Sequence, residues 1–155
     1  MPRTKPRRQG VSLLELLVVV TLIGIFASTV AMRFGRSLSA EFGSQGVARE
    51  LSLAMLACQR AAINTGDDHY VEFLATSGKI SSYRIMRDIS GVATLVDGPK
   101  PINTDVTVTT SSTTIRFNFE GGALSSYTVS VQGVARTWQI TVVAINGAIR
   151  VVQSA

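Results

Sequence analysis

The chain opens with a short basic segment that leads into an apolar run of membrane length carrying one carboxylate. Residues 11–32 contain a single charged side chain, Glu15, and 13 of these 22 residues are Leu, Ile, Val or Phe. As a helix rising about 1.5 Å per residue, the segment is roughly 33 Å long, enough to cross a bilayer core of about 30 Å. The sequence therefore predicts one transmembrane helix over residues 11–32.

Glu15 does not prevent insertion, but it needs an explanation. The 13 large apolar residues contribute about −4 to −8 kcal/mol together, as an upper bound. One acidic side chain costs about 2.5 to 3.5 kcal/mol on the same scale. An acid retained in a membrane helix usually has a partner, which makes Glu15 a candidate functional residue.

The flanking charges predict the orientation. Four basic residues and no acid precede the apolar run, so the short N-terminus is expected to stay in the cytoplasm. Arg33 and Arg36 reduce this charge asymmetry. Two other readings of the segment are a secretory signal peptide, with a loose cleavage site near Ala27–Ala31, and a plain single-span anchor.

These residues resemble the type IV prepilin-like N-terminus that type IV pilins share with type II secretion pseudopilins. Gly10 matches the last residue of the leader, Val11 the new N-terminus, and Glu15 the acid at the fifth mature position. The resemblance implies that a prepilin peptidase in the membrane cleaves after Gly10 and methylates the amine of Val11. The family more often has Phe or Met where this chain has Val11.

Physical chemistry supports the role that the family gives to Glu15. Cleavage after Gly10 would leave a charged α-amino group at the front of the apolar segment. A carboxylate four residues along can compensate that charge on its own chain or on a neighbour. Among packed apolar helices an unpaired charge is heavily penalised, so pairing between subunits would set their axial register.

Removal of the leader changes the charge balance. The whole chain has 15 basic and 10 acidic residues, and residues 1–10 hold four of the basic ones, which leaves 11 against 10. The net charge falls from +5 to +1, so the high isoelectric point says little about nucleic acid. Cys58 is the sole cysteine, which excludes an intramolecular disulfide.

A second helical pattern covers residues 38–64, with Gly66 as its stop and with Gly43 and Gly46 as weak points within it. Cys58 lies on an apolar helix face and is expected to be a small buried residue, because no nearby base would activate it as a catalytic thiol. The apolar face consists of Val47, Leu51, Ala54, Met55, Cys58 and Ala62. The side chains expected to face solvent are Arg49, Glu50, Gln59 and Arg60.

After Gly66 the pattern alternates with period two and predicts short strands. Asn146-Gly147 is expected to be a two-residue hairpin turn, and Pro99 and Pro101 are expected to mark a loop. A head of about 120 residues can bury one modest core. The expected strands are 69–74, 82–87, 106–110, 114–119, 127–131, 138–145 and 148–152.

The second region extends the resemblance. Residues 48–63, the Phe117–Gly122 segment and the final strands around Trp138 and Gly147–Val151 are similar to H-type minor pseudopilins and their minor-pilin relatives. The resemblance implies an α+β fold. In that fold a long N-terminal helix, with a membrane half and an amphipathic half, packs on a C-terminal antiparallel β head of two small sheets.

Candidates for metal or acid–base chemistry are few. Asp67-Asp68-His69 has metal-ligand residue types, but three consecutive residues point in different directions, so a solvated loop is expected. Asp97 and Asp105 flank a loop without the dense acidic cluster that calcium needs. His69 is the only histidine, and no G-x-S-x-G turn accompanies it.

Two aromatic positions are candidates for binding surfaces. Trp138 alternates with Ile140, which favours a core position over a ligand platform. Residues 83–87 place one tyrosine and two arginines on one strand, the type of pattern that single-stranded nucleic acid could use. Lysine is scarce in the chain, so nucleic acid is not an expected partner.

The sequence thus predicts a non-enzymatic minor pseudopilin, a structural subunit of a type II secretion pseudopilus involved in protein export. Its expected parts are a leader (1–10), a transmembrane assembly segment (11–32) and a periplasmic head (33–155) whose helix reaches about residue 64. It is expected in the inner membrane as a single-pass protein and, after assembly, in the pseudopilus. Its expected partners are the prepilin peptidase and other pseudopilin subunits, with no cofactor or metal.

Two alternatives stay open. The first is a minor type IV pilin that contacts DNA or surfaces, and exposed arginine on the head together with salt-sensitive DNA binding would favour it. The second is an exported or anchored hydrolase, and a pocket joining His69 to a nucleophile and a carboxylate would favour that.

Overall fold

A computed structural model describes the backbone of residues 13–134 and 136–154, and the side chains of these residues except 29–42. The chain divides into two compact units at the Arg36–Ser37 bond. Helix α1, Leu13–Thr65, contributes to both units, and eight strands follow it within the second. Each unit is described by itself.

The head portion of α1 ends where the sequence predicts. The helix stops at Thr65, and Gly66 adopts a φ of 76° while its N–H donates to the carbonyl oxygen of Ala62 at 3.0 Å. A glycine in the left-handed region closes a helix in this way without a Cβ penalty. Gly43 and Gly46 do not interrupt the α-helix.

The eight strands form two antiparallel sheets of four. Sheet A has the order β3-β2-β1-β5, and sheet B the order β4-β6-β7-β8. The strands of sheet A are β1 (Asp68–Thr76), β2 (Lys79–Ile89), β3 (Val92–Pro101) and β5 (Thr114–Phe117). Those of sheet B are β4 (Thr107–Thr110), β6 (Tyr127–Gln132), β7 (Thr137–Val142) and β8 (Ile149–Ser154).

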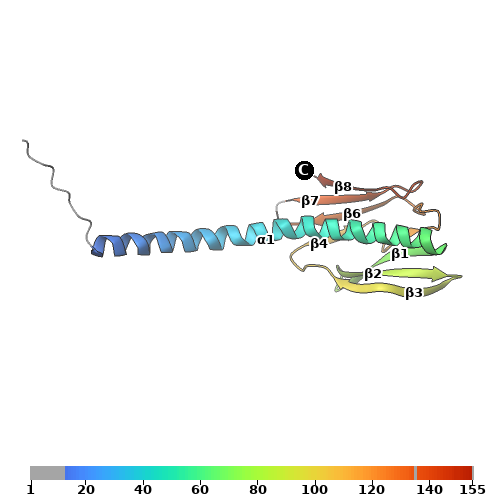
Figure 1. Ribbon diagram of the computed structural model, residues 1–155, viewed down its shortest axis with the longest axis horizontal. Coiled ribbons are helices and arrows are strands. Elements are labelled where there is room, and N and C mark those ends of the chain that lie inside the picture. The colour runs from blue at the N-terminus through green and yellow to red at the C-terminus, as the bar shows by residue number, and fades with distance from the viewer. Residues whose placement is uncertain (1–12, 135, 155) are drawn as a thin grey trace, which may run out of the picture. The chain divides into compact units, whose positions relative to one another are not determined.

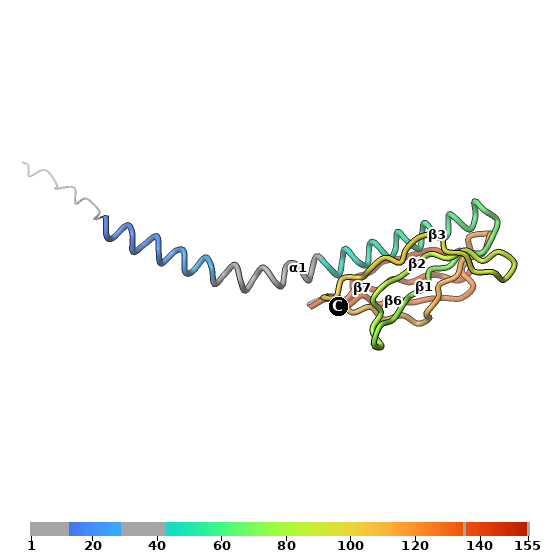
Figure 2. Tube along the Cα trace, turned by 90° about the horizontal axis from the view of Figure 1, so that it is seen from below, coloured from blue at the N-terminus to red at the C-terminus, as the bar shows by residue number. Residues whose placement is uncertain are grey.

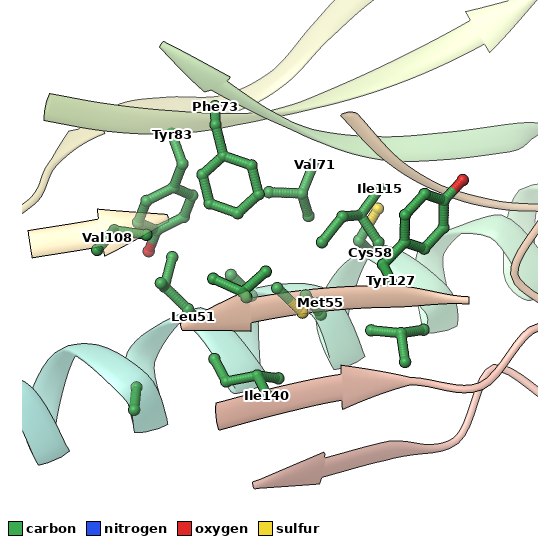
Figure 3. Packing of buried hydrophobic residues seen from close by; sticks show 14 of the residues in the cluster. Leu51, Met55, Cys58, Val71, Phe73, Tyr83, Val108, Ile115, Tyr127 and Ile140 are labelled. Atoms are coloured by element: carbon green, nitrogen blue, oxygen red, sulfur yellow. The ribbon is translucent and has the colours of Figure 1, made fainter. Parts of the chain in front are cut away.

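Within the head, α1 lies over the junction of the two sheets. Sheet B is above the helix and β2 and β3 of sheet A are below it in Figure 1, while Figure 2 shows the strands of both sheets on one side of the helix. The predicted apolar face of α1, from Val47 to Ala62, is buried against this junction. In Figure 3, Leu51 and Met55 lie between Phe73 of sheet A and Ile140 of sheet B.

One buried cluster therefore joins all three layers, as expected for a head of this size. It combines apolar side chains of α1 with inward residues of both sheets, including Val71, Ile115, Val129 and Val142, all 0% exposed. The predicted α+β class, with a helix packed on two small antiparallel sheets, is confirmed.

Strand β3 corrects the prediction of a loop at Pro99 and Pro101. Both prolines lie in this strand, which pairs with β2 and forms one edge of sheet A. Proline is tolerated on an edge strand because its missing N–H can face away from the ladder. The period-two signal is absent because both faces of β3 are largely exposed, and irregular pairing at Ile85 breaks the alternation further.

The predicted two-residue hairpin at Asn146-Gly147 is wrong in length. Strand β7 ends at Val142, β8 begins at Ile149, and the Val143 N–H donates to the Ala148 carbonyl oxygen at 3.0 Å across the loop. Gly147 has the expected positive φ, 60°. The Asn146 side chain instead accepts the Ala148 N–H at 3.0 Å, which stabilises a wider turn.

Candidate functional site

Within the first unit, residues 13–28 of α1 present apolar side chains all around the helix. All side chains of residues 13–28 are exposed, and Leu13, at 87%, is the most exposed of the large apolar ones. Apolar residues at successive positions around a 3.6-residue period leave no polar face, which distinguishes this segment from a helix with one apolar and one polar face. The exposed large apolar residues are Leu13, Leu14, Leu16, Leu17, Val18, Val19, Val20, Leu22, Ile23, Ile25 and Phe26.

Glu15 lies in the first described turn of α1 and is the only charged residue among residues 13–28. Its side chain is exposed, as a carboxylate must be if it is to meet a group on another chain. Gly10 and Val11, the predicted cleavage and methylation positions, lie outside the described residues. Their roles and the register role of Glu15 stay predictions.

The hydroxyl groups in this part of the helix are satisfied internally. Thr21 Oγ1 donates to the Val18 carbonyl oxygen at 2.8 Å, and Ser28 Oγ donates to the Gly24 carbonyl oxygen at 2.7 Å. Such bonds let a helix carry Ser and Thr in apolar surroundings without an unsatisfied donor. Among the described side chains, no helix is both long enough and apolar enough to meet the criterion for a membrane span.

In the head, the prediction that Gln59 faces solvent is wrong, because its side chain contacts backbone carbonyl groups of two loops. Its Nε2 donates to the carbonyl oxygen of Gly121 at 2.6 Å and lies 3.3 Å from that of Gly147 and 3.4 Å from that of Asn146. The side chain thus ties α1 to two loops that follow different sheets. Its position beside the apolar stripe was a usable signal, but only the fold reveals the carbonyl groups that it meets.

Asp67-Asp68-His69 is not the solvated loop that the sequence predicts. Asp68 and His69 begin β1, and His69 is buried at 1% exposure with Nδ1 3.0 Å from the Asp67 carbonyl oxygen. Asp67 pairs with Arg87, whose Nε lies 2.9 Å from Oδ2. Within the described chain, no group of three or more His, Cys, Asp or Glu side chains is placed to hold a metal ion.

The arginines of β2 are held in ion pairs. Arg84 Nε lies 2.7 Å from Glu72 Oε2, and this bond is the main reason that the pKa of Arg84 is raised. Arg87 pairs with Asp67, as described above. On β5, which pairs with β1, Arg116 Nη1 lies 2.8 Å from Asp88 Oδ2 of β2, and the Arg116 guanidinium carbon lies 4.8 Å from the Tyr70 ring centroid. A nucleic acid would have to compete with these carboxylates.

Tyr83 lies on the same strand as Arg84 and Arg87, as the sequence predicts, but its side chain is buried. The residue is 2% exposed and its hydroxyl donates to Glu50 Oε1 of α1 at 2.7 Å. Burial, followed by this hydrogen bond to Glu50, raises the pKa of Tyr83. Tyr83 therefore fastens sheet A to the helix, and it is not a stacking platform.

The remaining candidate residues are buried or are bonded to neighbouring residues of the head. Cys58 is fully buried, as predicted, and burial raises the pKa of its thiol to about 12. Asp97 pairs with Lys100 at 2.6 Å, which lowers the pKa of Asp97, and the Asp105 N–H donates to the Asn103 side chain at 3.0 Å. Trp138 is partly buried against the core, in line with the prediction, while its indole nitrogen finds no partner among the described residues.

Comparison with known proteins agrees with this geometry at both ends of the chain. Residues 5–31 match the family model of the prokaryotic N-terminal methylation motif. No curated protein matches the chain.

Two solved structures share the fold of the head. The minor pseudopilin EpsH of the type 2 secretion system of Vibrio cholerae has a TM-score of 0.59 and 12% identity, over 71% of this chain and 96% of that chain. The type IV minor pilin FimU of Pseudomonas aeruginosa strain PAO1 has a TM-score of 0.58 and 15% identity, over 70% and 87% of the two chains. The chain is therefore prepilin-like in its N-terminal motif and has the fold that minor pseudopilins and minor pilins share.

Proposed function

We propose that this chain is a minor pseudopilin, a non-enzymatic subunit of a type II secretion pseudopilus involved in protein export. The observation that carries the proposal is the methylation motif over residues 5–31 together with the apolar stretch of α1 over residues 13–28, in which the exposed Glu15 is the one charged side chain. The helix needs a covering, and Glu15 needs a cation. A bundle of such helices with charged N-termini supplies both.

The proposal divides the chain into a leader over residues 1–10, a transmembrane and assembly segment over 11–32, and a periplasmic head over 33–155. A prepilin peptidase cleaves after Gly10 and methylates Val11. The subunit then stays in the inner membrane until it enters the pseudopilus. There Glu15 pairs with the α-amino group of a neighbouring subunit and sets the axial register.

The head supports a structural role over the two alternatives. The strand that carries Arg84 and Arg87 binds both guanidinium groups to carboxylates, so it offers DNA little free charge. His69 is buried, with its ring against a backbone carbonyl, which is a poor position for a general base of a hydrolase. A minor type IV pilin stays the second candidate because FimU matches the fold nearly as well as EpsH does.

Processing is tested with Gly10→Leu. We expect the chain purified from its native membrane to start at Val11, and the variant to keep its leader, because a bulky residue blocks cleavage. The intact mass and the N-terminal sequence report both. A normally processed variant, or a native chain that starts near residue 28, would contradict the proposal.

Assembly is tested with Glu15→Ala. The variant should insert and be processed normally, because a helix without this charge enters the apolar membrane interior more easily. Its recovery with other pilin-like subunits should fall about tenfold. Glu120→Ala is the matched control, because Glu120 is an exposed carboxylate of the head. Equal recovery of the Glu15 variant and the control would remove the register role.

A further inference from the structure

The loop between β7 and β8 carries Asn146-Gly147, the one Asn-Gly pair of the chain. Asn146 is exposed, whereas Gly147 is buried. An asparagine followed by glycine is the dipeptide most prone to deamidation, because glycine has no side chain to hinder its backbone nitrogen from attacking the asparagine side chain. The loop is therefore a place where the chain can be modified without an enzyme.

Deamidation at this pair needs only the atoms of the two residues and water. The Gly147 nitrogen loses its proton to the solvent and attacks Asn146 Cγ. The N–Cγ bond forms, the Cγ–Nδ2 bond breaks, and Nδ2 leaves as ammonia. Water then opens the resulting five-membered succinimide at one of its two carbonyl carbons, which gives aspartate or isoaspartate without oxidation or reduction.

The fold holds the attacking nitrogen in place. The Gly147 N–H donates to the Val143 carbonyl oxygen at 2.9 Å, so this bond has to break before the nitrogen can lose its proton. The Ala148 N–H donates to Asn146 Oδ1 at 3.0 Å, which fixes the direction of the asparagine side chain. This second bond polarises the Asn146 carbonyl group and by itself favours attack, so the protection depends on the Gly147 nitrogen.

A residue of α1, Gln59, holds the same loop. Its Nε2 lies 3.3 Å from the Gly147 carbonyl oxygen and 3.4 Å from that of Asn146, while its 2.6 Å bond to the Gly121 carbonyl oxygen anchors the amide. Gly147 is packed so closely against Gly121 and Gln59 that an added Cβ would overlap both. A backbone enclosed in this way cannot turn freely, so the attack requires local opening of the loop.

We propose that Asn146 is a spontaneous deamidation site that the folded head keeps unreactive, and that Gln59 is the positioning residue that keeps the loop closed. The two products differ in how they fit back into the loop. Aspartate retains an Oδ atom that accepts the Ala148 N–H, whereas isoaspartate adds a carbon to the backbone where Gly147 has no room to shift. Formation of isoaspartate therefore converts a brief opening of the loop into a lasting one.

The first experiment follows deamidation by peptide mass mapping in the full-length chain, held in detergent micelles at mildly alkaline pH. Asn64, Asn103 and Asn118, none of which precedes a glycine, are internal controls. We expect Asn146 to react at least about tenfold more slowly in the folded chain than in the same chain unfolded in urea, because only the open loop reacts. Equal rates in the two states overturn the proposal.

The second experiment compares Gln59→Ala with Arg60→Ala, a change at an exposed neighbour on the same helix. Circular dichroism establishes that both variants are folded. Gln59→Ala should then raise the rate of deamidation at Asn146 about tenfold, while Arg60→Ala should leave it unchanged. An unchanged rate in the Gln59 variant overturns its positioning role.

Hydrogen exchange of the Gly147 N–H in the unaltered chain tests the same closure without a substitution, and so serves also if Gln59→Ala does not fold. We expect this amide to exchange at least about tenfold more slowly than in the unfolded chain. Exchange at the unfolded rate overturns the proposal, because the nitrogen would then lose its proton without hindrance from the fold.

Discussion

Gln59 shows how one polar side chain at the rim of an apolar helix face can organise the end of the head. Its amide nitrogen contacts backbone carbonyl groups from the loops before β6 and before β8. Gly147, one of these loop residues, is buried with a φ of 60°, and a Cβ there would overlap both Gln59 Nε2 and the Gly121 carbonyl oxygen. Close approach and backbone conformation therefore both require glycine at this position.

We predict that Gly147→Ala lowers the free energy of unfolding by about 2 kcal/mol or more, from left-handed strain and from steric overlap. Gly66→Ala is the matched control, since Gly66 also has a positive φ, 76°, but nothing lies within 4 Å of an added Cβ. The control should lose about 1 kcal/mol. Urea unfolding followed by Trp138 fluorescence measures both, and equal losses would contradict the role of close approach.

Because of Cys58, the free energy of unfolding of the head decreases as the pH rises in the alkaline range. Its thiol has a pKa of about 12 in the folded chain, against an ordinary value of 9.0. Above pH 9 the unfolded chain releases this proton while the folded chain keeps it, so the unfolded state is favoured as the pH rises. The stabilisation is fully present below pH 9 and is lost progressively toward pH 12.

We predict that the unaltered chain loses about 1 kcal/mol of unfolding free energy between pH 8 and about pH 10 through this group. Cys58→Ala should lose correspondingly less over the same range, although its stability at pH 8 is lower because a buried atom is removed. Guanidinium unfolding at the two pH values measures the slope. Identical slopes for both chains would show that the thiol does not titrate differently on unfolding.

Helix α1 continues through Gly43 and Gly46, which the sequence suggested as weak points. An added Cβ at Gly46 would meet nothing within 4 Å, and one at Gly43 would make ordinary contacts with Asn103 at 3.5 Å and Val106 at 3.7 Å. Neither glycine is required by steric crowding or by a positive φ. Their effect is to lower the stability of the helix through backbone entropy.

We predict that Gly46→Ala raises the free energy of unfolding by about 0.5 to 1 kcal/mol, because alanine restricts the unfolded chain and favours the helix. Gly66→Ala, outside the helix and at a positive φ, should change stability in the opposite direction. Urea midpoints compare the two variants. A destabilised Gly46 variant would mean that an unrecognised constraint acts at that position.

Strand β3 shows why an edge strand is difficult to predict from the alternation of apolar and polar residues. Val92, Leu95 and Val96 are each at least 50% exposed, so no alternation of buried and exposed residues marks the strand. It exists because β2 offers it a hydrogen-bonding edge. Pairing with a neighbour, and not local propensity, decides its conformation.

Among the described side chains, the members of the buried hydrophobic cluster lie within residues 47–142. In the first unit the described side chains, those of residues 13–28, are all exposed. The head thus has a buried apolar core of its own.

We predict that residues 37–155, expressed alone, fold without detergent. Their free energy of unfolding in urea should equal that of the head in the full chain in micelles to within about 0.5 kcal/mol, because parts of a protein that share no contacts contribute to stability independently. Circular dichroism and Trp138 fluorescence report the transition. A truncated chain that aggregates, or that unfolds without cooperativity, would mean that the first unit stabilises the head.

The apolar segment, the position of Glu15, the face of α1 from Val47 to Ala62 and most of the strands follow from the amino-acid sequence alone. Each depends on local periodicity or on one charge in an apolar run, and such signals need no knowledge of the fold. The match of residues 5–31 to the methylation motif agrees with that reading.

The tertiary structure alone decides the partners of individual polar groups. Gln59 meets two loops, His69 is buried, and Arg84 and Arg87 each pair with a carboxylate. These contacts join residues far apart in the chain, and hydrogen bonds and ion pairs act only over a few ångströms. Which groups come within that range depends on how the two sheets and the helix pack together.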